Sequence, residues 1–256
     1  QPMKLAAMEA LYNGGEDAGL TLIAAVNPFA QPDYANEASA PLKIEVPNML
    51  SILATHSVHG YVPGVNDIIK GYTNPTTGET ELPLAEKIEK GKKAITALQT
   101  YRQLDKGSRT PEMKAEIMEN MPYFGYGFIK EADQIVPFIP ICFYAFRVMV
   151  GLGTLFLAFF AVCLFLVKKK DIADMKYLHW VGLAMLPLAY VASECGWIVA
   201  EVGRQPWTIQ DMLPTWAAVS NIASSEVMIT FFLFLAIFTV LLITEISIMC
   251  KQIKKY

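Results

Sequence analysis

Hydrophobic residues are distributed unevenly, and they divide the chain into two parts of different character. Residues 1–135 mix polar and apolar positions as a water-soluble protein does, whereas residues 136–256 contain long apolar runs. Three of these runs exceed the ~20 residues that a helix needs to cross a bilayer, and they lie at about 139–167, 177–202 and 227–249. We therefore expect an all-α integral membrane helical bundle with three transmembrane helices, preceded by a mostly helical extramembrane domain.

The extramembrane part shows helical periodicity interrupted by residues typical of turns. We expect short helices at residues 1–12, 44–58 and 65–72, a longer charged helix at residues 84–104, and loops at residues 13–42 and 73–83. Thr110 is a suitable N-cap and Pro111 suits the first position of a helix, so a further helix is expected to begin there.

Basic residues near the ends of the apolar runs predict the orientation in the membrane. Lysines flank the connection at residues 168–176 and follow the last run at residues 251–256, whereas the connection at residues 203–225 holds Arg204 as its one basic residue. Because basic residues concentrate in cytoplasmic loops, the two lysine-rich segments are expected in the cytoplasm. Residues 203–225 and the domain at residues 1–135 are then expected on the outer side.

Composition excludes several classes of site and partner. The net charge of −3 points to no nucleic-acid partner. All four cysteines lie in the apolar part without C-x-x-C spacing, so we expect neither a disulfide framework nor a zinc site. We also expect none of the three histidines (His56, His59 and His179) to bind a metal. The chain starts Gln-Pro-Met-Lys, without an initiator Met or a signal peptide, so we expect a fragment whose earlier spans are missing.

Acidic residues within the second apolar run are the first candidate site. Glu194, Trp197 and Glu201 stand at i, i+3 and i+7 and therefore share one helix stripe, which leads on to Arg204. A charged residue within a span costs ~2.5–3.5 kcal/mol on insertion scales, so it usually has a partner or a function. Two interpretations stay open for Glu201: an ion pair with a basic residue of another span, or a carboxylate that ligates a metal or relays protons beside an acidic cofactor.

The first apolar run contains a second unusual pair. Arg147 stands two residues before Met149 inside an otherwise apolar helix. A methionine in a span is usually core filler. A thioether is also a known axial haem ligand, and a buried guanidinium is suited to meet a haem propionate. Spacing alone does not distinguish these two interpretations.

Three motifs, taken in order, resemble one family. Residues 4–10 (KLAAMEA), 143–150 (FYAFRVMV) and 196–207 (GWIVAEVGRQPW) resemble the start of the quinol-binding loop and two helix motifs of subunit I of the cytochrome bd quinol oxidases. The resemblance covers the whole chain but matches only the second half of that subunit, its periplasmic loop and the last three of its nine spans. The histidine haem ligands and a set of proton-carrying acidic residues of the family belong to the missing half.

The resemblance implies a role for each residue of the two candidate sites. Met149 resembles an axial ligand of the low-spin haem b, with Arg147 near that haem. Glu201 resembles the axial ligand of the high-spin haem b. Trp197 and Arg204 resemble its neighbours around the paired high-spin haem b and haem d. Taken alone, the chain is then expected to hold no complete haem site.

The same resemblance implies a quinol site and a reaction. Lys4 and Glu9 resemble the pair implicated in quinol oxidation, and the long loop favours ubiquinol over menaquinol. The expected protein is part of an electrogenic terminal oxidase that oxidises ubiquinol on the periplasmic side and reduces dioxygen to water, generating proton motive force. Implied partners are the missing N-terminal half, subunit II, a small single-span subunit and membrane lipid. The implied location is the bacterial inner membrane.

A different class of function also fits a three-span protein with intramembrane Glu and Arg. Such a chain suits a proton-coupled transporter subunit or a structural membrane anchor. Transporters more often show broken helices or repeat symmetry between spans, which this sequence does not display. Haem absorption in the purified assembly would distinguish an oxidase from either alternative.

Overall fold

The computed structural model describes residues 1–29, 43–104, 110–168 and 175–255. These residues fall into two compact units, Gln1–Ala217 and Ala218–Tyr256. The expected boundary between residues 135 and 136 separates extramembrane from spanning segments, and it stays a prediction. The residues expected to form loops at 30–42 lie outside the described residues.

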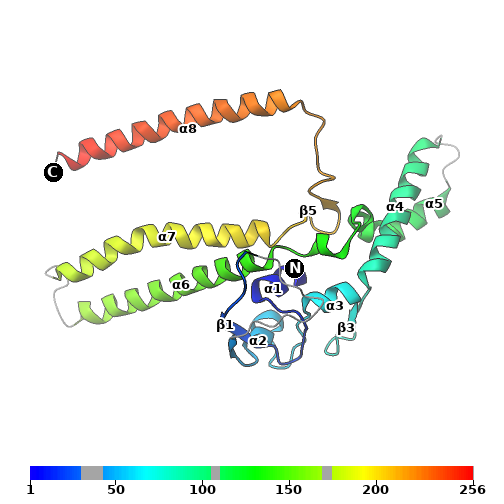
Figure 1. Cartoon of the computed structure of the whole chain (residues 1–256), viewed down its shortest axis with the longest axis horizontal. Helices are drawn as coiled ribbons and strands as arrows, with labels where there is room; N and C mark the ends of the chain where they lie inside the picture. Colours follow the sequence, from blue (N-terminus) through cyan, green and yellow to red (C-terminus); the bar gives the residue numbers. More distant parts are fainter. Residues whose placement is uncertain (30–42, 105–109, 169–174, 256) are drawn as a thin grey trace. The chain divides into compact units, whose positions relative to one another are not determined.

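Within the described residues, three helices are long and apolar enough to cross a membrane. Helices α6 (Ile139–Val167) and α7 (Lys176–Val202) pack side by side in an antiparallel pair, which extends away from the extramembrane elements (Figure 1). Helix α8 (Ser224–Ile253) belongs to the second unit and buries no residue. The runs expected at 139–167, 177–202 and 227–249 fall within these helices, because the length of an apolar run is itself a local property of the sequence.

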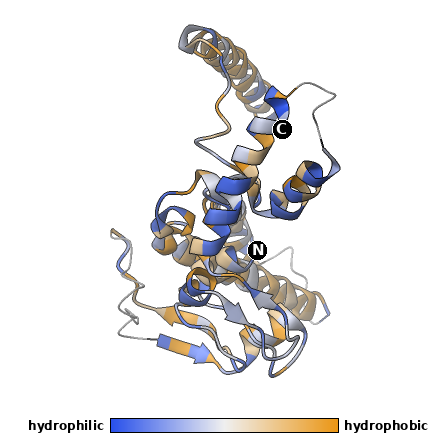
Figure 2. Cartoon of the chain, turned by 90° about the vertical axis from the view of Figure 1, so that its right-hand side faces the viewer, coloured by the Kyte–Doolittle hydropathy of each residue, from blue (hydrophilic) through white to orange (hydrophobic). Residues whose placement is uncertain are grey.

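The extramembrane part is mainly helical, as expected. Its helices are α1 (Pro2–Glu9), α2 (Met49–Thr55), α3 (Val65–Lys70), α4 (Leu84–Gln103), α5 (Pro111–Asn120) and the 3₁₀ helices η3 (Met121–Phe128) and η4 (Ala132–Ile135). Thr110 caps α5, since its side chain accepts a hydrogen bond from the Met113 backbone N–H at 3.4 Å. Helices α4 and α5 contain many hydrophilic residues, whereas the three candidate spanning helices are mainly hydrophobic (Figure 2).

Three short antiparallel strand pairs were not expected from the sequence. They are β1 (Leu20–Ala24) with β2 (Lys43–Val46), β3 (Tyr72–Thr73) with β4 (Thr80–Glu81), and β5 (Trp207–Ile209) with β6 (Leu213–Pro214). The predictions of a loop throughout 13–42 and of a helix beginning at residue 44 were therefore wrong. Strand β1 is a five-residue apolar run whose partner lies about twenty residues away, and short runs of this kind do not distinguish strand from helix.

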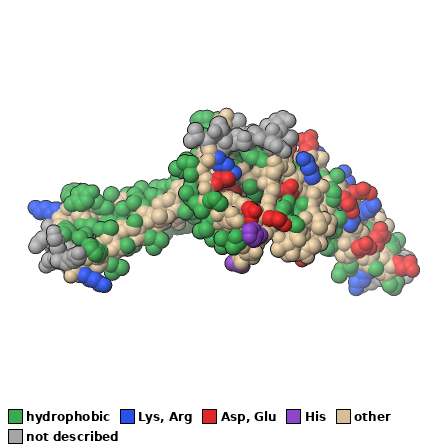
Figure 3. Space-filling model, turned by 90° about the horizontal axis from the view of Figure 1, so that it is seen from below, with side chains coloured by type: hydrophobic (Ala, Val, Ile, Leu, Met, Phe, Trp, Pro, Cys, Tyr) green, Lys and Arg blue, Asp and Glu red, His purple; other side chains and the backbone are tan. Residues whose placement is uncertain are grey.

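Helix α1 lies at the centre of the extramembrane core. Its Ala6 and Ala7 are fully buried, and they pack in one cluster with Val65 of α3, Trp207 of β5 and Ile139 at the start of α6. The small alanine side chains let the helix approach its neighbours closely. Helix α1 therefore packs at the extramembrane ends of the spanning pair. On the face that Figure 3 shows, hydrophobic side chains are spread along α6 and α7. The acidic side chains in view lie over the extramembrane elements.

Candidate functional site

Arg147 joins the membrane-spanning helix α6 to the extramembrane elements. It lies eight residues into α6, about 12 Å along the axis. One terminal nitrogen bonds the Glu9 carboxylate at 2.8 Å and the Thr21 carbonyl at 2.7 Å, and the other donates to the Met8 carbonyl. The guanidinium also stacks over the Phe143 ring, 3.8 Å from its centroid. Arg147 is thus held by both α1 and β1.

Glu9 is the acidic partner, and it is almost completely buried, with 1% of its surface exposed. Its Oε2 accepts from Arg147 and from the Thr21 backbone N–H at 3.2 Å, while its Oε1 is buried without a partner among the described residues. Burial raises the pKa of Glu9 above its ordinary value, and the nearby Arg147 charge offsets only part of this effect. An orphaned carboxylate oxygen with a raised pKa is suited to hold a proton.

Lys4 lies on a different side of α1 from the buried carboxylate. Its Nζ donates to the Ala200 carbonyl near the end of α7 at 3.4 Å, and it lines a pocket of about 600 Å³. The other lining residues come from α1, α2 and the segment that follows α2: Gln1, Pro2, Leu5, Met8, Ala54, Thr55, Tyr61, Val62 and Pro63. Glu9 does not line this pocket. Met8 connects the two sites, because its side chain lines the pocket and its carbonyl accepts from Arg147.

Glu201 and Arg204 pair at the extramembrane end of α7. Their side chains meet at 2.5 Å, and each is 42% exposed. The Nε atom of Arg204 is buried without a hydrogen bond among the described residues. Trp197, about one turn earlier, is 65% exposed. In the part of the chain that the structure describes, the partner of Glu201 is therefore a residue of the following loop rather than a base from another span.

A second pocket was not found by sequence reasoning. Its volume is about 230 Å³, and α1, α3, α4, η3 and the β5–β6 hairpin contribute to its lining. Tyr126 donates to Asp211 at 2.6 Å and stacks edge-on against Trp207, while Lys87 pairs with Glu81 at 2.7 Å. Burial, and then the Asp211 charge, raises the pKa of Tyr126. The sequence signal is the aromatic-rich η3 segment, MPYFGYGF, but its partners come from distant segments.

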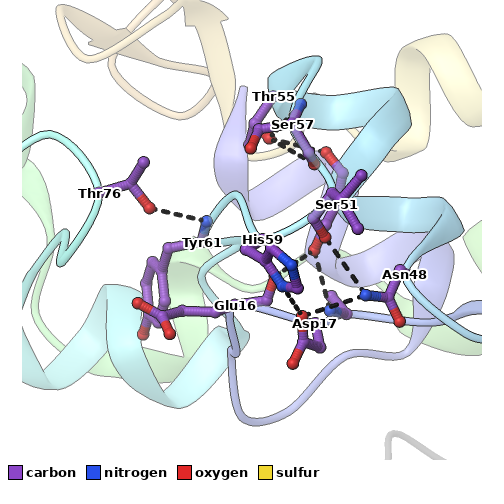
Figure 4. A network of polar contacts seen from close by, with 11 residues as sticks. Glu16, Asp17, Asn48, Ser51, Thr55, Ser57, His59, Tyr61 and Thr76 are labelled. Atoms are coloured by element: carbon purple, nitrogen blue, oxygen red, sulfur yellow. Dashed lines mark hydrogen bonds and ion pairs between the residues drawn. The ribbon is translucent and has the colours of Figure 1, made fainter.

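The extramembrane histidines belong to an exposed part of the molecule. His59 pairs with Asp17 at 2.7 Å, and Asn48 donates to the same carboxylate oxygen at 3.1 Å (Figure 4). Both partners of the His59–Asp17 pair are more than half exposed. Across the described residues, no three His, Cys, Asp or Glu side chains gather as a metal site would require.

Comparison with known proteins decides the family. The family model for cytochrome bd terminal oxidase subunit I matches residues 1–256. The chain belongs to this family. It is similar to the cytochrome bd-II ubiquinol oxidase subunit 1 of Escherichia coli (strain K12), with 30% identity over 98% of this chain and 48% of that protein. It is also similar to the cytochrome bd ubiquinol oxidase subunit 1 of Bacillus subtilis (strain 168), with 27% identity over 100% of this chain and 42% of that protein.

A solved structure supports the fold of this cytochrome bd family member. The bd oxidase from Geobacillus thermodenitrificans matches with a TM-score of 0.55 and 24% identity, over 94% of this chain and 39% of that chain. The all-α membrane architecture expected from the sequence is thus confirmed. The chain spans about half the length of the curated relatives it matches.

Haem is the cofactor that membership of the cytochrome bd family implies, and α6 and α7 offer donors of the right chemistry. The Met149 Sδ atom lies 3.1 Å from the position that a Cβ on Gly196 would take, so the missing side chain of Gly196 leaves room for the thioether. The Glu201 carboxylate is partly exposed, and the orphaned Nε of Arg204 lies beside it. These residues fit an anionic planar group. Arg147 fits less well, because both of its terminal nitrogens are already bound to α1 and β1.

Proposed function

We propose that this chain is the second half of subunit I of a quinol:oxygen oxidoreductase of the respiratory chain. The whole enzyme oxidises ubiquinol, reduces dioxygen to water and generates proton motive force. Family membership and the two ubiquinol oxidase relatives support this reaction over a transporter subunit or a membrane anchor. The observation that carries the proposal is the Glu9–Arg147 pair, which joins the quinol loop to a spanning helix.

The quinol is proposed to bind in the pocket beside Lys4. That pocket is lined largely by apolar side chains, with the Lys4 ammonium as a charged group suited to orient a quinol ring. Its lining residue Met8 precedes Glu9 in α1, so the buried carboxylate belongs to the residue next to one that lines the pocket. Glu9 then receives a proton released from the quinol, since its raised pKa and its unpartnered Oε1 suit it as a proton acceptor.

The haems are proposed to lie against the outer halves of α6 and α7. Met149 would hold the low-spin haem b, and Glu201 would hold the high-spin haem b with haem d beside it, while the haems supply electron transfer and dioxygen reduction when bound. Trp197 offers an exposed aromatic face for packing against a ring. Arg204 offers a positive charge and a free Nε–H to a propionate. Arg147 acts on its haem through its charge, because its terminal nitrogens stay with the loop.

The topology and partners follow from the same proposal. In the bacterial inner membrane, residues 1–135 and 203–225 face the periplasm, and residues 168–176 and 251–256 face the cytoplasm. The first half of subunit I supplies the histidine ligands that this chain lacks. Subunit II and a small single-span subunit complete the complex. The exposed apolar surface of α8 fits contact with such partners or with lipid.

The test is the Glu9→Gln variant in the assembled oxidase. Gln keeps the shape of the side chain but cannot take up the quinol proton, so ubiquinol turnover should fall ~10²-fold, the lower range for a general base. The reduced-minus-oxidised haem spectra should stay unchanged. Glu16→Gln, a change in a neighbouring loop carboxylate, is the control and should keep full turnover. Wild-type turnover in Glu9→Gln would remove Glu9 from the mechanism.

A further inference from the structure

Helix α7 carries a stripe of polar and aromatic residues that faces away from α6. Tyr190, Glu194, Trp197 and Glu201 stand at i, i+4, i+7 and i+11, so at 100° per residue they lie within an arc of about 60°. Tyr190 and Trp197 are 76% and 65% exposed, and Glu194 is exposed as well. Helix α6 packs on the other side of α7, where Met149 meets Gly196. We call these four residues the Tyr190 stripe.

Glu194 is the residue of this stripe that has no role in the mechanism above. Its side chain makes no hydrogen bond or ion pair with any part of the chain that the structure describes. The one charged residue of α6 is Arg147, which is bound to Glu9. A carboxylate within a span is costly to insert, and in the interior of membrane proteins such residues mark proton pathways and paired charges.

The position of Glu194 along the helix fits a proton pathway. It precedes Glu201 by seven residues, which places it about 10.5 Å deeper in the membrane on the same stripe. Pro187 lies still further toward the cytoplasmic end, and it has no N–H to donate to the Leu183 carbonyl one turn below. Leu183 falls on the same side of α7, since it precedes Tyr190 by seven residues. In membrane helices such freed carbonyls are satisfied by neighbouring helices, by Ser or Thr side chains, by local changes of the helix or by ordered water.

We propose that Glu194 carries protons from the cytoplasmic side of α7 to the dioxygen-reducing site at the Glu201 end. This inference rests on the proposed oxidase function. Glu194 as a carboxylic acid releases one proton toward the site and becomes a carboxylate. It then takes up one proton from water on its cytoplasmic side and returns to the acid. The electrons come from quinol, so each proton consumed in forming water is matched by an electron that the enzyme already supplies.

The test compares Glu194→Gln and Glu194→Asp in the assembled oxidase. Gln cannot release a proton, so oxygen-reduction turnover should fall at least ~10-fold, whereas Asp should recover part of it. The haem content and the rate at which quinol reduces the low-spin haem should stay unchanged in both variants. Infrared redox difference spectra should show a protonated carboxyl band in the wild type that is lost in Glu194→Gln. Glu226→Gln, in the first turn of α8, is the control and should behave as wild type.

Two results would overturn the inference. Wild-type turnover in Glu194→Gln would show that no essential proton passes through this residue. Loss of haem or of assembly in Glu194→Gln, with normal assembly in Glu194→Asp, would identify Glu194 as a structural ion-pair partner. Failure of the proposed oxidase function would look different. The unmodified assembly would then contain no haem or would not oxidise quinol.

Discussion

Removing Arg147 should release α1 and β1 from the spanning helix α6, because it leaves the buried Glu9 carboxylate without its counter-charge. In the Arg147→Met variant, Glu9 at 1% exposure would stay ionised only at high cost, and breaking a buried pair on one side typically costs ~3–5 kcal/mol. The Met8 and Thr21 carbonyls would also lose their donor. We therefore expect the contact of α6 with α1 and β1 to lose about 4 kcal/mol of local stability, which raises the equilibrium constant for its opening roughly a thousandfold.

A double-mutant cycle isolates the energy of this pair. Glu9→Gln alone should cost less than Arg147→Met, because a neutral amide can be buried at a lower cost than an unpaired carboxylate. The double variant should be more stable than the sum of the single effects predicts, with a coupling of about 2 kcal/mol or more. The assay is hydrogen exchange of the Thr21 amide, which donates to Glu9, in the assembled complex. Arg102→Met, at an exposed arginine near the end of α4, is the control and should leave this amide protected.

The free energy of local opening measured at the Thr21 amide should depend on pH, and the raised pKa of Glu9 determines the direction. Because the folded protein holds the Glu9 proton more tightly than the unfolded chain does, this group stabilises the fold most below its ordinary pKa of 4.5. Its contribution is lost as the pH rises from that value through the raised pKa. Glu9→Gln should abolish this pH dependence of the opening free energy, which is obtained after the intrinsic exchange rate at each pH is divided out. Strictly additive single variants, or an opening free energy that keeps the same pH dependence in Glu9→Gln, would refute this account of the loop contact.

Three further changes test the haem sites and the smaller pocket. Arg147→Ala should lower the reduction potential of the low-spin haem b, since a nearby positive charge favours the reduced state; a redox titration with an unchanged or higher potential would contradict this. If Glu201 holds the high-spin haem b as proposed, Glu201→Ala should lose that haem together with haem d and keep the low-spin haem whose proposed ligand is Met149, as a pyridine haemochrome count would show. Full retention would leave Glu201 as the ion-pair partner of Arg204. Tyr126→Phe should destabilise the extramembrane part by ~1 kcal/mol, because Asp211 Oδ1 loses the Tyr126 hydroxyl and keeps only the Gln210 side-chain donor, and thermal unfolding of the complex measures this.

The spanning helices and the stripe on α7 were predictable because they depend on residues close together in the sequence. An apolar run of sufficient length forms a helix in lipid, where every backbone group must find a partner within the segment. Thr110 caps its own helix for the same local reason, through the backbone of Met113. The stripe that holds Trp197 and Glu201 follows from helical periodicity alone. The motifs around these residues are contiguous runs of the chain, so they too indicate the family without any knowledge of the fold.

The contact between Glu9 and Arg147 depends on tertiary structure, because the two residues are 138 positions apart and neither carries a local signal of the other. The family resemblance implied separate roles for Glu9 at a quinol and for Arg147 near a haem, and the fold brings the two residues together as one buried ion pair. Only the packing of α1 and β1 against α6 removes water from Glu9 and raises its pKa. Likewise Trp207, in an expected loop, becomes buried because β5 pairs with β6 beside Tyr126. Burial and charge pairing arise when distant segments pack together, so the local sequence around each residue does not reveal them.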